Sequence, residues 1–117
     1  MSDQIYRIDK KSGMAIMTLM LECVMPDDNT ALKEAFTNLL DGGTNNIILD
    51  LSKAGYVSSL ILASFVFMHK RAKEAGGNLV ICCINDKVKE VLSVTNLDKV
   101  FDIAKDRDEA AKKLTKK

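Results

Sequence analysis

The 117-residue sequence has no tryptophan, one proline and one histidine, and only 5% of its residues are aromatic. So few aromatic side chains leave little surface on which unpaired bases can stack. A surplus of charge is absent too, because 17 lysines and arginines accompany 16 aspartates and glutamates, for a net charge of +1. Binding to a phosphate backbone requires a basic surface. The composition therefore predicts no nucleic-acid partner.

The sequence also lacks long apolar runs and regularly spaced cysteines. No apolar run approaches the roughly 20 residues of a membrane-spanning helix, and residues 1–4 do not begin a signal peptide. The three cysteines, Cys23, Cys82 and Cys83, do not suit a disulfide framework, and no Cys-x-x-Cys motif is present. We expect buried thiols in a reduced, cytoplasmic protein with no membrane association, no metal and no cofactor.

Patterns typical of catalytic sites are missing as well. The sequence contains neither a Gly-x-Gly-x-x-Gly fingerprint nor a P-loop. Its one histidine, His69, follows Ser59 by ten residues in the same predicted helix, a rise of roughly 15 Å that prevents a nucleophile–base pair. The adjacent carboxylates Asp27 and Asp28 are explained by a solvated helix cap. The sequence predicts that the protein is not an enzyme and has no catalytic residues.

Strand and helix signals alternate along the chain. Residues 5–8 and 14–21 predict a β-hairpin, and a helix follows that ends at Gly42-Gly43. The remaining expected elements are a strand at 47–51, a helix at 59–75, a strand at 79–84, a helix capped by Asn85-Asp86, a short strand at 100–103 and a helix at 106–114. A hairpin followed by alternating strands and helices indicates a single α/β domain, residues 1–117, with a mixed sheet.

Asp50 raises one alternative, because it ends an apolar strand. Receiver domains of response regulators carry a phosphate-accepting aspartate at such a place, and they bind Mg²⁺ through acidic residues after the first strand. Here the strand at 14–21 is followed by Glu22 and Cys23, and the chain opens with a hairpin. We therefore interpret Asp50 as a loop or cap residue.

The helix at 59–75 is apolar on all sides over its first two turns, where Leu60, Ile61 and Phe67 lie. A helix that packs on a sheet normally has one polar face. Either loops cover this helix on several sides, or part of it is an exposed apolar patch for a partner. An exposed patch would also favour a homodimer.

The start of this helix is the strongest candidate for a regulatory site. Ser58 and Ser59 lie where a strand and a short linker meet the helix. Free backbone N–H groups at a helix start favour a phosphate, so the hydroxyl groups there are natural places for phosphorylation.

A longer pattern extends over residues 46–102. Its parts are 47–51, Tyr56, 58–63, Gly76-Gly77, 79–84, Val88-Lys89 and 96–101. This order resembles the STAS domain of anti-sigma factor antagonists. The resemblance implies the STAS fold, with a mixed four- to five-stranded sheet and helices packed mainly on one side.

The resemblance also implies a function. Such proteins bind an anti-sigma factor, often itself a serine kinase, and so release a sigma factor; phosphorylation blocks this binding and a PP2C-type phosphatase restores it. The family's phosphorylated serine falls on Ser59, with Ser58 the less favoured site. Partner contacts are expected at Asp27, Asp28, Ser58, Ser59, Leu60, Ile61 and Phe67.

The sequence departs from the family pattern at this site. Ser58 replaces the usual aspartate, and Leu60-Ile61 replace the usual glycine. Two hypotheses follow: a partner-switching anti-sigma factor antagonist regulated at Ser59, or a non-switching STAS scaffold or subunit of a signalling or lipid-transport assembly. In the second, Ser59 is an unmodified helix N-cap.

Overall fold

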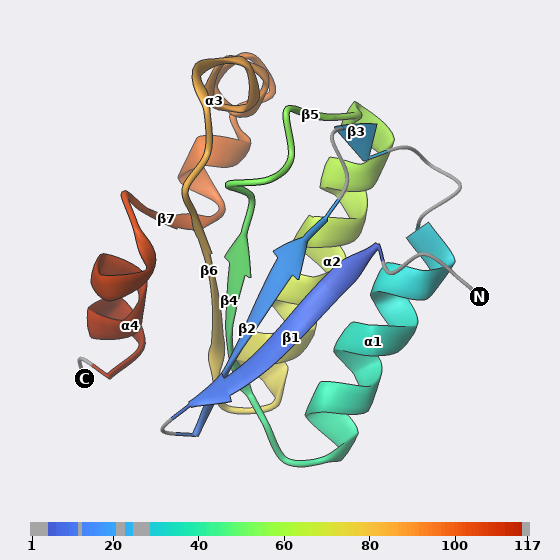
Figure 1. The fold of residues 1–117 in the computed structure, drawn as a ribbon, viewed down its shortest axis with the longest axis vertical. Helices are drawn as coiled ribbons and strands as arrows, with labels where there is room; N and C mark the ends of the chain where they lie inside the picture. Colours follow the sequence, from blue (N-terminus) through green and yellow to red (C-terminus); the bar gives the residue numbers. More distant parts are fainter. Residues whose placement is uncertain (1–4, 12, 21–22, 25–28, 116–117) are drawn as a thin grey trace.

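The computed structural model describes residues 5–11, 13–20, 23–24 and 29–115. The main sheet has five strands in the order β1-β2-β4-β6-β7 (Figure 1). β1 and β2 form the expected antiparallel hairpin, and the later strands run parallel to β2. The strands are β1 (Tyr6–Lys11), β2 (Met14–Leu19), β4 (Asn46–Asp50), β6 (Asn78–Cys82) and β7 (Asp102–Ala104).

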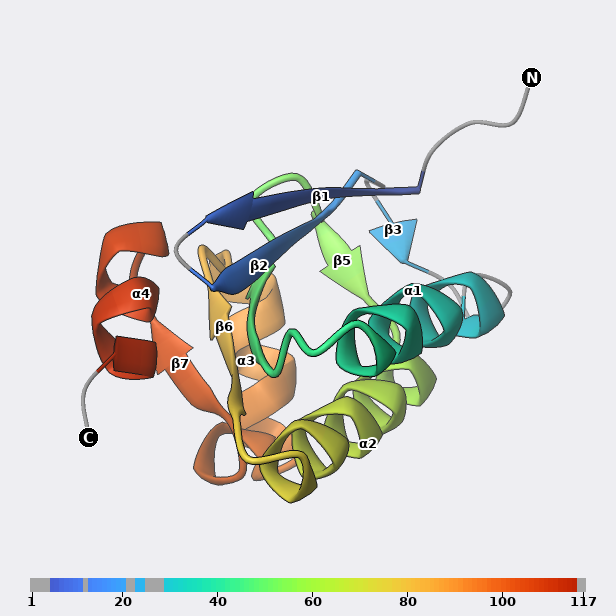
Figure 2. The same ribbon diagram turned by 90° about the horizontal axis from the view of Figure 1, so that it is seen from below.

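Four helices connect or follow the strands: α1 (Asn29–Asp41), α2 (Ser59–Glu74), α3 (Asp86–Val94) and α4 (Arg107–Thr115). Figure 2 shows α1 and α2 on one face of the sheet and α4 on the opposite face. The apolar residues of α1, α2 and α3 join one face of the sheet in the larger core, whereas α4 covers a smaller cluster on the other face. This confirms the α/β class and the mixed five-stranded sheet.

Alternate side chains of each strand point to opposite faces of the sheet, and so they pack into one or the other of these two cores. Ile47 and Leu49 belong to the larger core, while Ile48 between them packs toward α4. Because both faces of β4 are covered, an almost continuously apolar strand is required there. Full burial of one such side chain contributes about 1.5–3 kcal/mol.

Glycines end α2 where the sequence predicts. Gly76 has a φ of +92°, a conformation that glycine adopts without strain. At Gly77 a Cβ atom would lie 2.1 Å from the backbone oxygen of Asn45, so a larger residue would clash with the start of β4. The pair therefore both stops the helix and lets β6 begin beside β4.

Several features differ from the sequence-based expectation: β1 extends to Lys11 instead of ending at residue 8, and β6 ends at Cys82 instead of at residue 84. A second, two-stranded sheet joins β3 (Cys23–Val24) to β5 (Tyr56–Val57), which are too short to show periodicity. The last strand begins at Asp102 rather than at Val100, because a 3₁₀ turn at Leu97–Lys99 precedes it. None of the helices in the described part of the chain is long and apolar enough to cross a membrane.

Candidate functional site at the start of the second helix

The two serines have different roles at the start of α2. Ser58 is the N-cap, and its Oγ accepts a hydrogen bond from the backbone N–H of Ile61 at 3.3 Å. Ser59 is the first residue of the helix and its side chain is exposed. The cap is thus Ser58, and the interpretation of Ser59 as the N-cap is wrong. The Ser59 hydroxyl is left accessible at the positive end of the helix dipole.

A stripe of exposed apolar side chains continues from Ser59 along α2. Leu60 is 67% exposed and Phe67 is 40% exposed, and Ala63 between them is exposed as well. Spacings of three and four residues place these side chains on one side of a helix. We call Leu60, Ala63 and Phe67 the α2 stripe.

Positive charge flanks the Phe67 end of the α2 stripe. The Nζ atom of Lys33, on α1, lies 4.8 Å from the centroid of the Phe67 ring, and the guanidinium carbon of Arg71 lies 5.7 Å from it. Cations over an aromatic face interact favourably with its electrons. The surface can therefore contact a group that is apolar and one that is acidic.

A hollow of about 340 Å³ lies between α1 and the start of α2. Its walls include Asn29, Lys33, Leu60 and Ser64. The Ser64 hydroxyl donates a hydrogen bond to the side chain of Asn29, which joins the two helices beneath the hollow. The concave surface is adjacent to the α2 stripe and continuous with it through Leu60.

The expected partner residues do not all lie on this surface. Ile61 is fully buried in the core, so its expected contact with a partner is wrong: the helix turns its side chain toward the sheet. Ser58, Ser59, Leu60 and Phe67 have the half-buried or exposed positions that contact would require. Asp27 and Asp28 lie outside the described residues.

His69 lies further along α2, away from the serines. It is half-buried, and its ring meets that of Phe101 edge to face with the centroids 5.9 Å apart. Burial, aided by the nearby charge of Lys73, lowers the pKa of His69 below its ordinary value. The residue acts as a packing element between α2 and the loop before β7.

Asp50 forms a polar cluster that the sequence does not reveal. It is 2% exposed at the end of β4, rather than in a loop. Its carboxylate accepts hydrogen bonds from the Ser52 backbone at 2.8 Å and from Arg107 Nε at 2.5 Å, and Arg107 Nη2 donates to Thr18 at 2.8 Å. Burial alone would raise the pKa of Asp50, but the bonds from Ser52 and Arg107 outweigh it and leave this pKa below its ordinary value.

The two adjacent cysteines lie beside this cluster. Cys82 is buried, as expected, whereas Cys83 is half-buried, and their Sγ atoms are 3.1 Å apart. Burial is the main cause that raises the pKa of both thiols, so they are protonated at neutral pH. The side chain of Cys23 lies outside the described part of the structure.

Comparison with known proteins agrees with this architecture. Residues 28–110 match the model of the STAS domain. The chain is 30% identical over 105 residues to BtrV of Bordetella bronchiseptica, provisionally named an anti-sigma factor antagonist, covering 89% of each protein. It is 34% identical over 85 residues to a provisionally named anti-sigma factor antagonist of Thermotoga maritima, covering 73% of this chain and 75% of that protein.

Solved structures show the same likeness. The crystal structure of a provisionally named anti-sigma factor antagonist from Thermotoga maritima superposes with a TM-score of 0.83 at 28% identity, covering 93% of each chain. The chain therefore belongs to the STAS domain family.

Proposed function

We propose that this protein is an anti-sigma factor antagonist that binds its anti-sigma factor through the start of α2. The observation that carries the proposal is the exposed hydroxyl of Ser59 at the head of the exposed α2 stripe. Relatives named as anti-sigma factor antagonists support it, with the chain covering most of their length. The proposed function is binding, without a catalytic step.

The chemistry of the surface limits the partner. Leu60 and Phe67 offer apolar contact, and Lys33 and Arg71 add positive charge at its edge. Central apolar contacts with a polar rim are typical of protein interfaces. We infer that the anti-sigma factor presents an apolar segment with an acidic side chain beside Phe67.

Phosphorylation of Ser59 would switch this contact off. A phosphate adds about −1.5 to −2 charges, which a desolvated apolar interface disfavours. At the N-terminus of α2 the same charge is favourable for the helix, because it faces the positive end of the dipole. The switch would change binding without unfolding the domain. A serine kinase, the anti-sigma factor itself, would add the phosphate and a PP2C-type phosphatase would remove it.

Intact mass spectrometry tests the switch. The protein is co-expressed with a candidate anti-sigma factor kinase, and one phosphate adduct is expected. Ser59→Ala should lose the adduct, whereas Ser58→Ala, the matched control one residue away, should keep it. An adduct that persists in Ser59→Ala would contradict the assignment.

A second function rests on Leu60-Ile61, which replace the family's glycine at the helix start; of the two, Leu60 has an exposed side chain. A bulky residue there hinders the close approach of a kinase, which favours a non-switching STAS scaffold or subunit of a signalling or lipid-transport assembly. The variant Leu60→Gly distinguishes the scaffold hypothesis from the phosphorylation switch. If Leu60 blocks the kinase, this variant gains phosphorylation at Ser59 that the parent lacks; if the parent is already phosphorylated, the scaffold hypothesis fails.

A further inference from the structure

A row of polar side chains crosses the sheet at the carboxyl ends of its parallel strands. Thr18 pairs in register with Asp50, and Asp50 with Cys82. All three occupy the face that α4 covers, because every second side chain of a strand points to the same face. The carboxyl edge of a parallel sheet is where α/β proteins commonly bind ligands. The partner surface proposed on α2 does not use this row.

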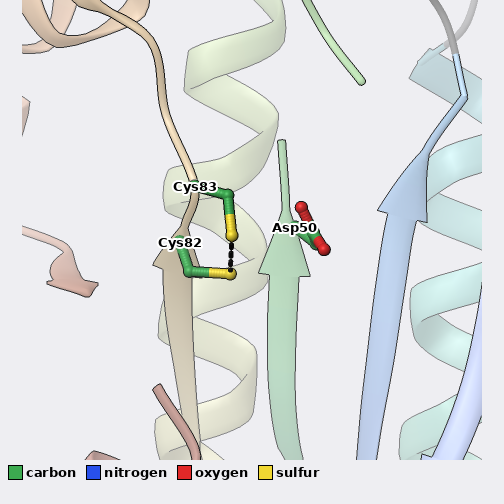
Figure 3. A group of neighbouring side chains, drawn as sticks. All are labelled: Asp50, Cys82 and Cys83. Carbon is green, nitrogen blue, oxygen red and sulfur yellow. Dashed lines mark hydrogen bonds between the residues drawn. The ribbon is translucent and has the colours of Figure 1, made fainter. Parts of the chain in front are cut away.

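Cys83, which follows the row, has an unusual backbone conformation. Its φ is +65°, in the left-handed region that costs a non-glycine residue roughly 1–2 kcal/mol. In a regular strand Cys83 would turn its thiol to the face opposite Cys82. The left-handed conformation instead brings the two Sγ atoms together at 3.1 Å. Figure 3 shows both sulfurs on the side of β6 that faces Asp50.

The three residues offer a suitable set of metal ligands. One Sγ atom from each cysteine and one carboxylate oxygen of Asp50 all lie within 4.8 Å of one another. Around a tetrahedral zinc ion with bonds of about 2.0–2.3 Å, ligand atoms lie roughly 3.3–3.8 Å apart. The ligand atoms would therefore have to move closer by roughly 1 Å to reach this spacing. Within the part of the chain that the structure describes, these residues form a group of three such ligands.

The site can be reached from solvent. A cavity of about 410 Å³ is lined by Asp50, Cys83 and the exposed residues Ser52 and Asp106. Cys82 is buried next to Cys83, and the two Sγ atoms lie 3.1 Å apart. An ion entering the cavity would meet the half-buried thiol of Cys83 before the buried thiol of Cys82.

We propose that Cys82, Cys83 and Asp50 bind one thiophilic divalent cation of the zinc class, with water as the fourth ligand. Each thiol loses its proton to solvent as its sulfur–metal bond forms. The carboxylate of Asp50 has about four lone-pair positions, so it can bind the ion and keep its hydrogen bond from Arg107. The three positive charges of the divalent ion and the Arg107 guanidinium balance the three negative charges of two thiolates and one carboxylate.

Cobalt absorption spectroscopy on the full chain tests this site, because Co²⁺ replaces Zn²⁺ and absorbs strongly when thiolates bind it. Under a non-chelating phosphine reductant, we expect one Co²⁺ per chain and loss of the absorption when Zn²⁺ is added. Cys83→Gly suits the left-handed backbone and should remain folded, and it should bind Co²⁺ at least about tenfold more weakly. Asp50→Asn should also bind Co²⁺ at least about tenfold more weakly than the parent.

Cys23→Ser is the matched thiol control and should leave cobalt binding unchanged. Absence of thiolate–cobalt absorption in the parent, or an unchanged affinity in Cys83→Gly, would overturn the proposal. Unchanged affinity in a folded Asp50→Asn would overturn the three-residue ligand set. The result is independent of Ser59, so failure here and failure of the phosphorylation switch are separate outcomes.

Discussion

Ser58 and Ser59 illustrate how adjacent residues of one type diverge once the helix forms. The hydroxyl of Ser58 is hydrogen-bonded to the backbone of the first turn, and that of Ser59 is exposed. The sequence identifies the pair as a helix start, because a polar pair precedes an apolar run. It does not decide which serine is the cap, since both are equally good capping residues.

A stability measurement distinguishes the two residues. Ser58→Ala removes the cap and should lower the free energy of unfolding by about 1 kcal/mol. Ser59→Ala should change it by less than about 0.5 kcal/mol, because its side chain is exposed. Urea denaturation followed by circular dichroism measures both. Equal losses would show that the capping role is shared.

The ion pair between Asp50 and Arg107 could not be predicted from the sequence, because 57 positions separate its partners. Arg107→Met leaves a buried carboxylate without its cation and should cost about 2 kcal/mol at pH 7, less than a fully buried pair because Arg107 is 44% exposed.

The cost of Arg107→Met should depend on pH. The pKa of Asp50 is lowered in the folded state, so its stabilising contribution is present above about pH 4, the unfolded value, and is lost as the pH falls through the folded value. Melting temperatures of parent and variant should therefore converge as the pH is lowered below about 4. A difference that stays constant with pH would exclude this cause. Lys53→Met, on an exposed loop residue, is the control.

At the scale of elements, α2 has a buried face and an exposed stripe, and both consist mainly of apolar residues. Periodicity could predict the helix and its glycine stop, but it could not predict which apolar residues are exposed. Leu60 and Ile61 are neighbours, yet one is 67% exposed and the other fully buried. Their difference is set by α1 and the sheet, which the local sequence does not contain.

The pair Phe67→Asp and Ile61→Asp tests this division of α2. Asp at position 61 would bury an unpaired carboxylate in the core and should lower stability by more than about 4 kcal/mol. Asp at position 67 should lower it by less than about 1 kcal/mol, because Lys33 and Arg71 are near. Calorimetry gives the stabilities, and binding to the anti-sigma factor should be lost in Phe67→Asp although this variant remains folded. Retained binding would move the interface away from the α2 stripe.

At the scale of the molecule, the mixed sheet could be predicted because a hairpin followed by alternating strands and helices indicates it, but the order of its strands comes from the structure. The position of α4 could not be predicted from its highly charged sequence. It packs Ala110 and Leu114 against the face that α1 and α2 leave open (Figure 2). That helix completes the burial of β4 and β6, and its first residue, Arg107, bonds to Asp50.

The small area of the α2 stripe determines the oligomeric state that we expect. Three side chains cover much less than the roughly 800 Å² per partner of a stable interface. We therefore expect any homodimer through α2 to be weak, with monomers at micromolar concentration in sedimentation velocity. Phe67→Asp should abolish dimers seen at higher concentration. A tight dimer that survives this change would place its interface on another surface.

The separation of the cap at Ser58 from the exposed hydroxyl at Ser59 has a consequence for turnover in the cell. Proteases act on the small fraction of a protein that is unfolded, so any change in folding free energy alters its abundance. Since the hydroxyl that caps the helix is not the one proposed to carry the phosphate, phosphorylation would leave the cap intact, and it would not make the protein more prone to degradation. Phosphorylation at Ser59 would then change partner binding without depleting the protein.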